Sequence, residues 1–397
     1  GIALKDKSVK EGIKLWWSLI KNLESGSYLD DYLTEDEIID RAVAILESDY
    51  DVKIDLEAFR ALAHKFWSSS PAFDDVKPFF EKCPLPIYII TNNGEEYVSA
   101  FLKNNGLHCA GIVCGDMVKA YKPRKELFGK AHREKFGNSA GFLLKYLDSA
   151  IRLHMQCHPS VPFAERFLNS PFGKTEGYFI LAIRPECEGY IYLGFQRTPE
   201  YGAFKRAVET QDTEAILAGF DRIPIKPGDC FYVPGGIPHA IGGGVFMVEM
   251  MEPTDFAVRI EFERGGYRLP ESARFMGRDV DFALSMFDFT ARDLRQTREE
   301  FFVEPLPLPI EGDAKRFSLF DQRKTSCFRL ERILLDGSAA VVHNAFRVLI
   351  VTRGTGKLFC QDRTLVLRQY DRVLIPHRVP ELRLSGNLEL LVAMPPE

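Results

Sequence analysis

Paired cysteines, membrane-length apolar runs and an excess of basic charge are all missing from this sequence of 397 residues. Its eight cysteines are scattered without a CxxC pair, so we expect free thiols in a reducing cytosol. The longest apolar runs are strand-sized, whereas a membrane-spanning helix needs about 20 residues. The net charge of -5, with lysine and arginine spread along the chain, argues against nucleic acid and membrane as partners. Because no basic segment leads into an apolar one after Gly1, we predict no signal peptide and a cytoplasmic location.

The composition, with 46% apolar and 27% charged residues, is that of a globular protein of two or three domains. In residues 1–137, apolar residues recur at helical spacing in four segments, and two short apolar runs have the character of strands. We expect helices at 11–23, 35–46, 56–66 and 95–104, and strands at 86–91 and 110–114. This alternation predicts an α/β, Rossmann-like domain with a parallel, doubly wound sheet, whose active groups lie at the carboxyl ends of the strands.

From about residue 150, short strands replace the helices. Runs rich in β-branched and aromatic residues alternate with Gly and Pro turns, which is typical of a β-sandwich or barrel. We expect strands at 177–183, 190–195, 229–233, 245–250 and 256–262, and one helical insertion at about 198–218. A proline-rich linker at 305–309 precedes the same pattern at 316–395, so the two β units are interpreted as a diverged repeat. The predicted domains are therefore 1–137, 138–310 and 311–397.

Two segments of the first β unit carry residues that can bind a divalent metal ion. Residues two apart on a strand face the same side, so Gln156 is expected to point with His158, and Lys174 with Glu176. A neutral imidazole and a carboxylate are ordinary ligands for zinc and similar ions, and an amide oxygen can join them. His154 shares the strand face of Gln156 and His158, and we interpret it as a packing or neighbouring residue rather than a fifth ligand.

A third segment, residues 228–239, has the spacing of the second cupin motif. It consists of Gly, five residues, Pro, one residue, Gly, two residues and then His239. The glycines allow a tight turn that presents the histidine to the barrel interior. Three separate segments thus supply compatible ligands, which favours a metal site over a structural histidine.

Together these segments resemble the signature of type I phosphomannose isomerases. The resemblance covers about residues 140–397 and rests on Gln156-Cys-His158-Pro159, Gly173-Lys174-Thr175-Glu176 and Pro234-Gly-Gly-Ile-Pro-His239-Ala240-Ile-Gly242. It implies two all-β cupin (jelly-roll) units, with one Zn²⁺ per chain held in the first by Gln156, His158, Glu176 and His239. It also implies that mannose 6-phosphate is isomerised to fructose 6-phosphate through a cis-enediol, with the metal as Lewis acid and template.

The resemblance extends to the segment 249–259 and suggests catalytic roles. Arg259 would stabilise enediolate charge, and Lys174 would shuttle a proton between oxygens or bind charge. Glu249 and Asp255 are alternative candidates for the base or an orienting carboxylate.

After Arg259 the sequence departs from the family pattern, which leaves the exact sugar open. Arg264 or Arg268 is expected to bind the substrate phosphate, because guanidinium pairs with phosphate oxygens.

The second cupin repeat has lost the metal motif. Tyr370 and Arg378 replace its glycines, Glu381 replaces its histidine, and His377 lies out of register. We therefore expect no metal there and a structural role for this unit.

The N-terminal segment resembles haloacid-dehalogenase-like phosphatases with a helical cap. Thr91 in Tyr88-Ile-Ile-Thr91 matches their second motif, and Lys122 in Tyr121-Lys122-Pro123 matches their third. The Asp-x-Asp nucleophile and the acidic pair for Mg²⁺ are not visible, and Asp49-Tyr50-Asp51 follows a helix rather than a strand. Two explanations stay open: a remnant without catalysis, or a domain whose stretches near residue 1 and near residue 137 lie outside this sequence.

The leading interpretation is a zinc-dependent sugar-phosphate isomerase acting on a small molecule, of unspecified oligomeric state. A bifunctional isomerase–phosphatase, with Mg²⁺ in the N-terminal domain, applies if that domain is complete. A non-catalytic, sugar-sensing cupin would not need Lys174 and Arg259 together. A cupin oxygenase would carry a histidine-rich ligand set, and Gln156 argues against it.

Overall fold

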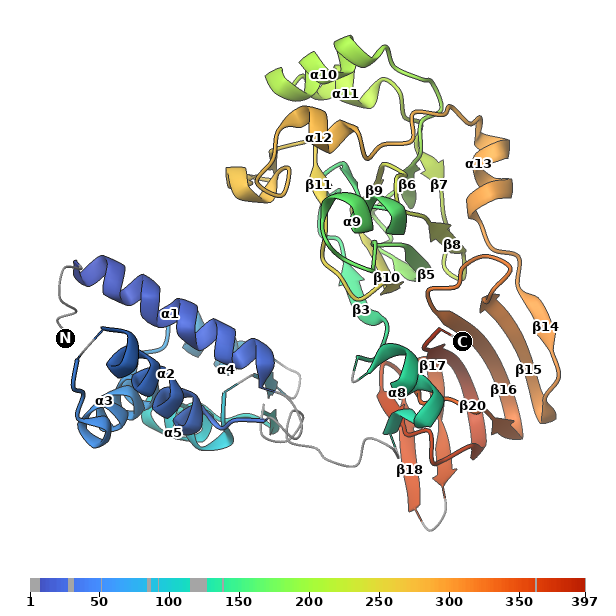
Figure 1. Ribbon diagram of the computed structural model, residues 1–397. Coiled ribbons are helices and arrows are strands. Elements are labelled where there is room, and N and C mark those ends of the chain that lie inside the picture. The colour runs from blue at the N-terminus through green and yellow to red at the C-terminus, as the bar shows by residue number, and fades with distance from the viewer. Residues whose placement is uncertain are drawn as a thin grey trace. The chain divides into compact units, whose positions relative to one another are not determined.

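The computed structural model describes residues 8–27, 32–50, 52–83, 87–91, 93–114, 127–137, 139–360 and 363–396. The chain divides into two compact units, Gly1–Arg124 and Lys125–Glu397, and each is described by itself (Figure 1). Across those described ranges, every helix is too short or too polar to cross a lipid bilayer.

The described part of the first unit is a helical region with one small sheet. Its elements are α1 (Val9–Gly26), α2 (Glu35–Tyr50), α3 (Leu56–Ser69), α4 (Val76–Lys82), β1 (Tyr88–Ile90), α5 (Glu95–Asn105) and β2 (Gly111–Val113). The four predicted helices are confirmed with slightly wider bounds. The two strands pair in parallel, as predicted, with Tyr88 opposite Gly111. Two strands do not make a doubly wound sheet, so the described residues support only the coarser description of a helical region.

Local sequence explains where these helices begin and end. Ser8 and Glu11 form a capping box at the start of α1, and the Asp55 side chain accepts the main-chain N–H of Ala58 at the start of α3. Gly106 ends α5 in the left-handed conformation, with φ of 65°, which a glycine adopts without steric cost.

The first β module of the second unit contains two antiparallel sheets. Its elements are α8 (Lys130–Phe136), β3 (Leu143–Asp148), β4 (Gln156–Cys157), α9 (Val161–Phe167), β5 (Glu176–Ile183), β6 (Tyr190–Leu193), α10 (Tyr201–Thr210), α11 (Thr213–Leu217), β7 (Ile223–Pro224), β8 (Cys230–Val233), β9 (His239–Ile241), β10 (Val245–Met251), β11 (Val258–Arg259), β12 (Glu263–Arg264), β13 (Tyr267–Arg268), η2 (Glu271–Ala273), α12 (Val280–Leu284) and α13 (Leu294–Phe301). The sheet orders are β3-β10-β5-β8 and β11-β4-β9-β6-β7. Ile180 of the first sheet and Leu193 and Ile241 of the second belong to one buried cluster, so the sheets enclose a shared core.

The second β module is one seven-stranded antiparallel sheet with long strands (Figure 1). It consists of β14 (Leu306–Leu308), β15 (Glu311–Phe320), β16 (Arg329–Val342), β17 (Arg347–Cys360), β18 (Arg363–Arg368), β19 (Arg372–Ile375) and β20 (Glu381–Met394). The strand order is β14-β15-β16-β20-β17-β18, with β19 on β17. Phe179 and Val248 of the first module and Phe320, Phe328 and Leu391 of the second belong to one buried cluster, so the two modules share a hydrophobic contact.

One turn has the same left-handed backbone in both β modules. Gly228 of the first motif has φ of 90°, and Tyr370, which replaces it in the second, has φ of 71°. The second repeat therefore keeps the left-handed turn although a tyrosine disfavours it.

Two sequence predictions about the first module are wrong: one strand is predicted too long, and three helices are missed. The strand expected at 256–262 is reduced to β11, because the N–H of Arg259 donates to the carbonyl of Arg274, and that of Phe262 to the side chain of Gln211. The sequence also predicted a single helical insertion, now α10 and α11, whereas α9, α12 and α13 are additional helices. Their capping residues at 160, 279 and 293 were a usable signal.

Candidate metal centre

His158, Glu176 and His239 form a buried cluster in the first β module. One ligand atom from each lies within 4.8 Å of the others, and each residue is only 1% exposed. Glu176 begins β5, His239 begins β9 and His158 follows β4, so the cluster joins both sheets. Gln156 pairs with His239 across β4 and β9, and its Nε2 atom lies 3.3 Å from His239 Nε2. The four residues that the sequence grouped are therefore together.

Backbone carbonyls fix which nitrogen of each histidine carries a proton. His158 Nδ1 lies 2.8 Å from the carbonyl oxygen of Phe256, and His239 Nδ1 lies 2.9 Å from that of Ile237. Since a carbonyl oxygen can only accept, both Nδ1 atoms donate, and in the neutral rings both Nε2 atoms carry lone pairs.

These lone pairs converge on the carboxylate of Glu176. Nε2 of His158 lies 3.2 Å from Oε1 of Glu176, and Nε2 of His239 lies 3.3 Å from Oε2. Despite that proximity, Nε2 of His158 has no hydrogen-bond partner among the described residues. The unpartnered Nε2 atom of His158 therefore faces the carboxylate of Glu176 and lies beside His239. A cation would stabilise this arrangement, so the cluster could hold a metal ion.

Burial and nearby charge set the protonation of this cluster. Burial lowers the pKa of His158 to about 4, more than the Glu176 carboxylate raises it, so the ring is neutral at neutral pH. Burial raises the pKa of Glu176, but neighbouring groups, among them the Lys174 ammonium, outweigh burial and hold that pKa well below its ordinary range. The Tyr178 hydroxyl donates to Glu176 and helps to orient it. A neutral His158 imidazole beside an ionised Glu176 carboxylate has the protonation state that metal binding requires.

Close backbone packing holds the ligand segments together. A Cβ atom added to Gly173 or Gly235 would lie 2.5 Å from the carbonyl oxygen of Pro159, so the segments around all three residues can meet only because both are glycines. The N–H of Gly236 also donates to the carbonyl oxygen of His158 at 2.7 Å, which ties the loop before His239 to the segment of the other histidine.

Lys174 lies beside the cluster, as the sequence predicted. Its side chain is almost fully buried, and Nζ lies 3.2 Å from Oε1 of Glu176 and 3.6 Å from Oδ1 of Asp255. The Asp255 side chain, in contrast, is 82% exposed. Lys174 thus connects the buried cluster to an accessible carboxylate.

Glu249 on β10 is a second buried carboxylate near the cluster. It is 3% exposed, and Nζ of Lys145 on β3 lies 3.2 Å from its Oε1 atom. Burial raises the pKa of Glu249, and the negative charge of Glu176 raises it further, while Lys145 and Lys174 lower it less. Sequence reasoning missed Lys145; the signal was a lone lysine inside the apolar run that became β3.

Arg259 of β11 and His239 of β9 lie on opposite sides of Gln156. Arg259 lies opposite Gln156 in the β4–β11 pair, and its guanidinium donates to the carbonyl of Ala273 at 3.2 Å. Burial lowers the pKa of His154, which feels the charges of Arg259 and Arg264, and its Nε2 atom is buried without a hydrogen-bond partner in the described ranges.

The two arginines predicted to bind phosphate have different settings. Nε of Arg264 donates to the carbonyl of Arg152 at 3.2 Å, and its side chain is 26% exposed. Arg268 is exposed on the β12–β13 hairpin. Beneath them, Arg152 and Glu261 form a buried, bidentate pair with both distances at 2.6 Å.

The remaining motif residues lie elsewhere. In the second β module, His377 Nδ1 is 3.1 Å from the carbonyl of Asn344, and Glu381 begins β20. In the first unit, Thr91 follows β1 and its Oγ1 accepts the N–H of Asn93, whereas Lys122 falls outside the described residues.

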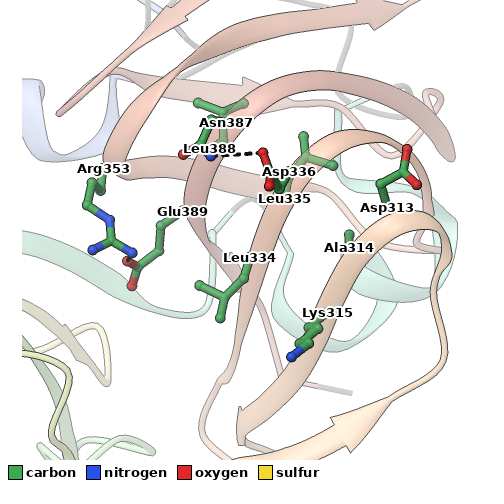
Figure 2. A pocket seen from close by; sticks show the side chains of 10 residues that line it. All are labelled: Asp313, Ala314, Lys315, Leu334, Leu335, Asp336, Arg353, Asn387, Leu388 and Glu389. Atoms are coloured by element: carbon green, nitrogen blue, oxygen red, sulfur yellow. Dashed lines mark hydrogen bonds and ion pairs between the residues drawn. The ribbon is translucent and has the colours of Figure 1, made fainter.

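A hollow of about 370 Å³ in the second module is not this site. Figure 2 shows its mixed lining, in which Arg353 pairs with Glu389 and Asn387 donates to Asp336, beside apolar side chains such as Leu334 and Leu388. It contains none of the candidate residues.

The chain is similar in sequence to curated mannose-6-phosphate isomerases. No protein-family model matches the chain. The probable mannose-6-phosphate isomerase GmuF of Bacillus subtilis (strain 168) is 35% identical over 272 residues, covering 67% of this chain and 80% of the relative. The mannose-6-phosphate isomerase ManA of the same organism is 26% identical over 272 residues, covering 66% and 78%.

Solved structures share the fold. The crystal structure of the mannose 6-phosphate isomerase from Bacillus subtilis matches with a TM-score of 0.52 and 22% identity, over 66% of this chain and 79% of that one. A putative mannosephosphate isomerase from Archaeoglobus fulgidus matches with a TM-score of 0.53 and 17% identity, over 69% and 77%.

Proposed function

The chain belongs to the mannose-6-phosphate isomerase family, and we propose that it is a zinc-dependent aldose–ketose isomerase that converts mannose 6-phosphate to fructose 6-phosphate through a cis-enediol. The observation that carries the proposal is the buried cluster of His158, Glu176 and His239. The Nε2 atoms of both histidines point at its carboxylate, and that of His158 has no hydrogen-bond partner among the described residues.

We propose Gln156, His158, Glu176 and His239 as the four ligands of one zinc ion. The terminal amide of Gln156 can rotate by half a turn, so that Oε1 rather than Nε2 faces the cluster. Two neutral imidazoles, a carboxylate and an amide oxygen are compatible with zinc. When bound, zinc supplies Lewis acidity that polarises the sugar oxygens.

Proton transfer between C1 and C2 is assigned to the charged residues beside the cluster. Glu249 is the favoured base, since its buried carboxylate has a raised pKa and a base works best with a pKa nearer the operating pH. Lys174 moves a proton between the two sugar oxygens, and Asp255 orients its ammonium group. Arg259 stabilises the negative charge of the enediolate.

We propose that the substrate phosphate binds on the side of Arg264. This guanidinium is partly exposed and lies near His154 and Arg259, whereas Arg268 stands on an exposed hairpin and makes the outer contact. A bidentate guanidinium–phosphate pair suits an anionic sugar.

The test is a coupled assay for fructose 6-phosphate formation from mannose 6-phosphate, with and without chelator. The proposal predicts activity that chelation abolishes and added zinc restores. A protein that binds zinc but converts neither this substrate nor other hexose phosphates would contradict it and leave a sugar-sensing cupin as the alternative.

For the other parts of the chain we propose the division 1–137, 138–310 and 311–397, with the last part structural. Residues 1–137 would be a haloacid-dehalogenase-like domain, a view supported by the parallel β1–β2 pair and by Thr91 at the end of β1. An isomerase–phosphatase that also uses Mg²⁺ follows only if that domain is complete. All eight cysteines are free, which supports a cytosolic location.

A further inference from the structure

Glu252, just after β10, is a buried carboxylate that no part of the proposed mechanism uses. It is 3% exposed, and its two oxygens accept main-chain N–H groups from Gly173 at 3.2 Å and Thr175 at 2.9 Å. These two N–H groups flank Lys174. The main chain of Glu252 also donates to the carbonyl of Thr175 at 3.1 Å. One residue therefore holds the segment on both sides of Lys174.

The same segment is fixed on its opposite side. The N–H of Lys174 donates to the carbonyl of Pro159 at 2.9 Å, and Thr254 Oγ1 donates to the carbonyl of Gly173. The main-chain N–H of every residue from Gly173 to Thr175 is thus bonded. With the backbone held, the side chain of Lys174 is directed at Glu176.

The surroundings of Glu252 argue against a purely structural ion pair. Within the described ranges, no lysine, arginine or histidine lies within ion-pair distance of it. Main-chain dipoles therefore stabilise its charge, and burying a carboxylate in this way is costly unless its bonds are good.

We infer that Glu252 is a positioning residue for the isomerase: it fixes the backbone on either side of Lys174 so that the ammonium group reaches the metal centre and the sugar oxygens. This inference rests on the proposed function of that centre.

The test combines Glu252→Gln with Lys174→Met in a double-mutant cycle. Glu252→Gln keeps one acceptor oxygen but turns an NH₂ group toward a main-chain N–H, so the loop shifts. We expect kcat to fall about 100-fold, the cost of a misplacement of about 1 Å, with KM within about twofold and zinc stoichiometry unchanged. In a protein that already carries Lys174→Met, Glu252→Gln should lower kcat by less than about a further twofold. The effects of two residues that act as a unit are not additive.

Glu331→Gln is the matched control, since Glu331 is also a buried glutamate, 8% exposed, but lies in the second module and pairs with Arg316 and His343. It should lower the melting temperature and leave kcat unchanged.

If Glu252→Gln does not fold, Thr254→Val is the alternative variant, because it removes the side-chain bond to the carbonyl of Gly173. It should lower kcat by a smaller factor, and its effect should also be non-additive with that of Lys174→Met.

Hydrogen exchange separates this inference from the proposed function. In Glu252→Gln, the amides of residues 173–176 should exchange faster than in wild type, whatever substrate the enzyme uses. The positioning role would be overturned by any of three results in Glu252→Gln. These are unchanged amide exchange, loss of zinc, and a fall in kcat that multiplies with that of Lys174→Met. A wild type without isomerase activity but with the predicted exchange change would overturn only the proposed function.

Discussion

His158 and His239 present their Nε2 atoms to opposite oxygens of one carboxylate, at 3.2 Å and 3.3 Å from Glu176. Each ring donates its Nδ1 proton to a main-chain carbonyl. A neutral ring therefore has no proton on Nε2 to donate to Glu176. A metal ion bound between the three groups would stabilise this arrangement of facing acceptor atoms.

The acid limb of the pH–rate profile should report Glu249. Because its pKa is raised and a base must be deprotonated, kcat/KM should fall with acid at a pH above the ordinary carboxyl range. Lys145→Met removes a cation that lowers this pKa, so the acid limb should move to higher pH. If the acid limb of the profile does not move in Lys145→Met, Glu249 is not the base.

Phosphate recognition should depend on Arg264 more than on Arg268. Arg264→Gln should raise KM for the sugar phosphate about tenfold or more, since a charge-assisted hydrogen bond contributes about 1.5–3 kcal/mol. Arg268→Gln, on the exposed hairpin, is the matched control and should change KM less. Equal effects of the two variants would show that Arg264 has no special role.

His154 should prove not to be a ligand. Its Nε2 atom is buried without a partner in the described ranges, yet it stands apart from the cluster of His158, Glu176 and His239. We expect His154→Gln to retain one zinc ion per chain, measured by elemental analysis of the purified protein, while His158→Gln loses it. Loss of zinc in His154→Gln would make His154 a fifth ligand.

Stability should fall in acid through Glu261. Burial raises the pKa of this carboxyl, but the hydrogen bonds and charge of Arg152 outweigh it, so the folded-state pKa is lowered. The contribution of the pair is therefore present above the unfolded pKa of about 4.3 and is lost as the pH falls through the lower folded value.

Glu261→Gln leaves Arg152 buried without its charge partner and should cost about 3–5 kcal/mol at neutral pH, because an uncompensated buried charge is expensive. The difference from wild type should shrink below pH 4. Urea unfolding at several pH values measures both, and a difference independent of pH would contradict the assignment.

The residues of the buried cluster could be grouped from the sequence because they sit in motifs with local geometry. Glycines at fixed spacing specify the turn before His239, and period-two alternation grouped Lys174 with Glu176, which lie 3.2 Å apart. The helices of the first unit were equally accessible, since their apolar spacing and caps are local.

Residues that act through long-range pairing could not be predicted. Lys145 meets Glu249 only because β3 lies beside β10, and Glu252 meets Gly173 only after the chain has returned through several strands. No sequence-local pattern encodes those contacts. The strand expected at 256–262 was overestimated for the same reason, since the side chain of Gln211 binds the N–H of Phe262.

The most direct test of the account is the coupled fructose 6-phosphate assay on wild type and His239→Ala, each with and without chelator, together with zinc content. The account predicts that wild type is active with one zinc ion, that chelation abolishes this activity, and that His239→Ala lacks both zinc and activity. Activity that survives chelation, or a His239→Ala variant that remains active without zinc, would contradict it.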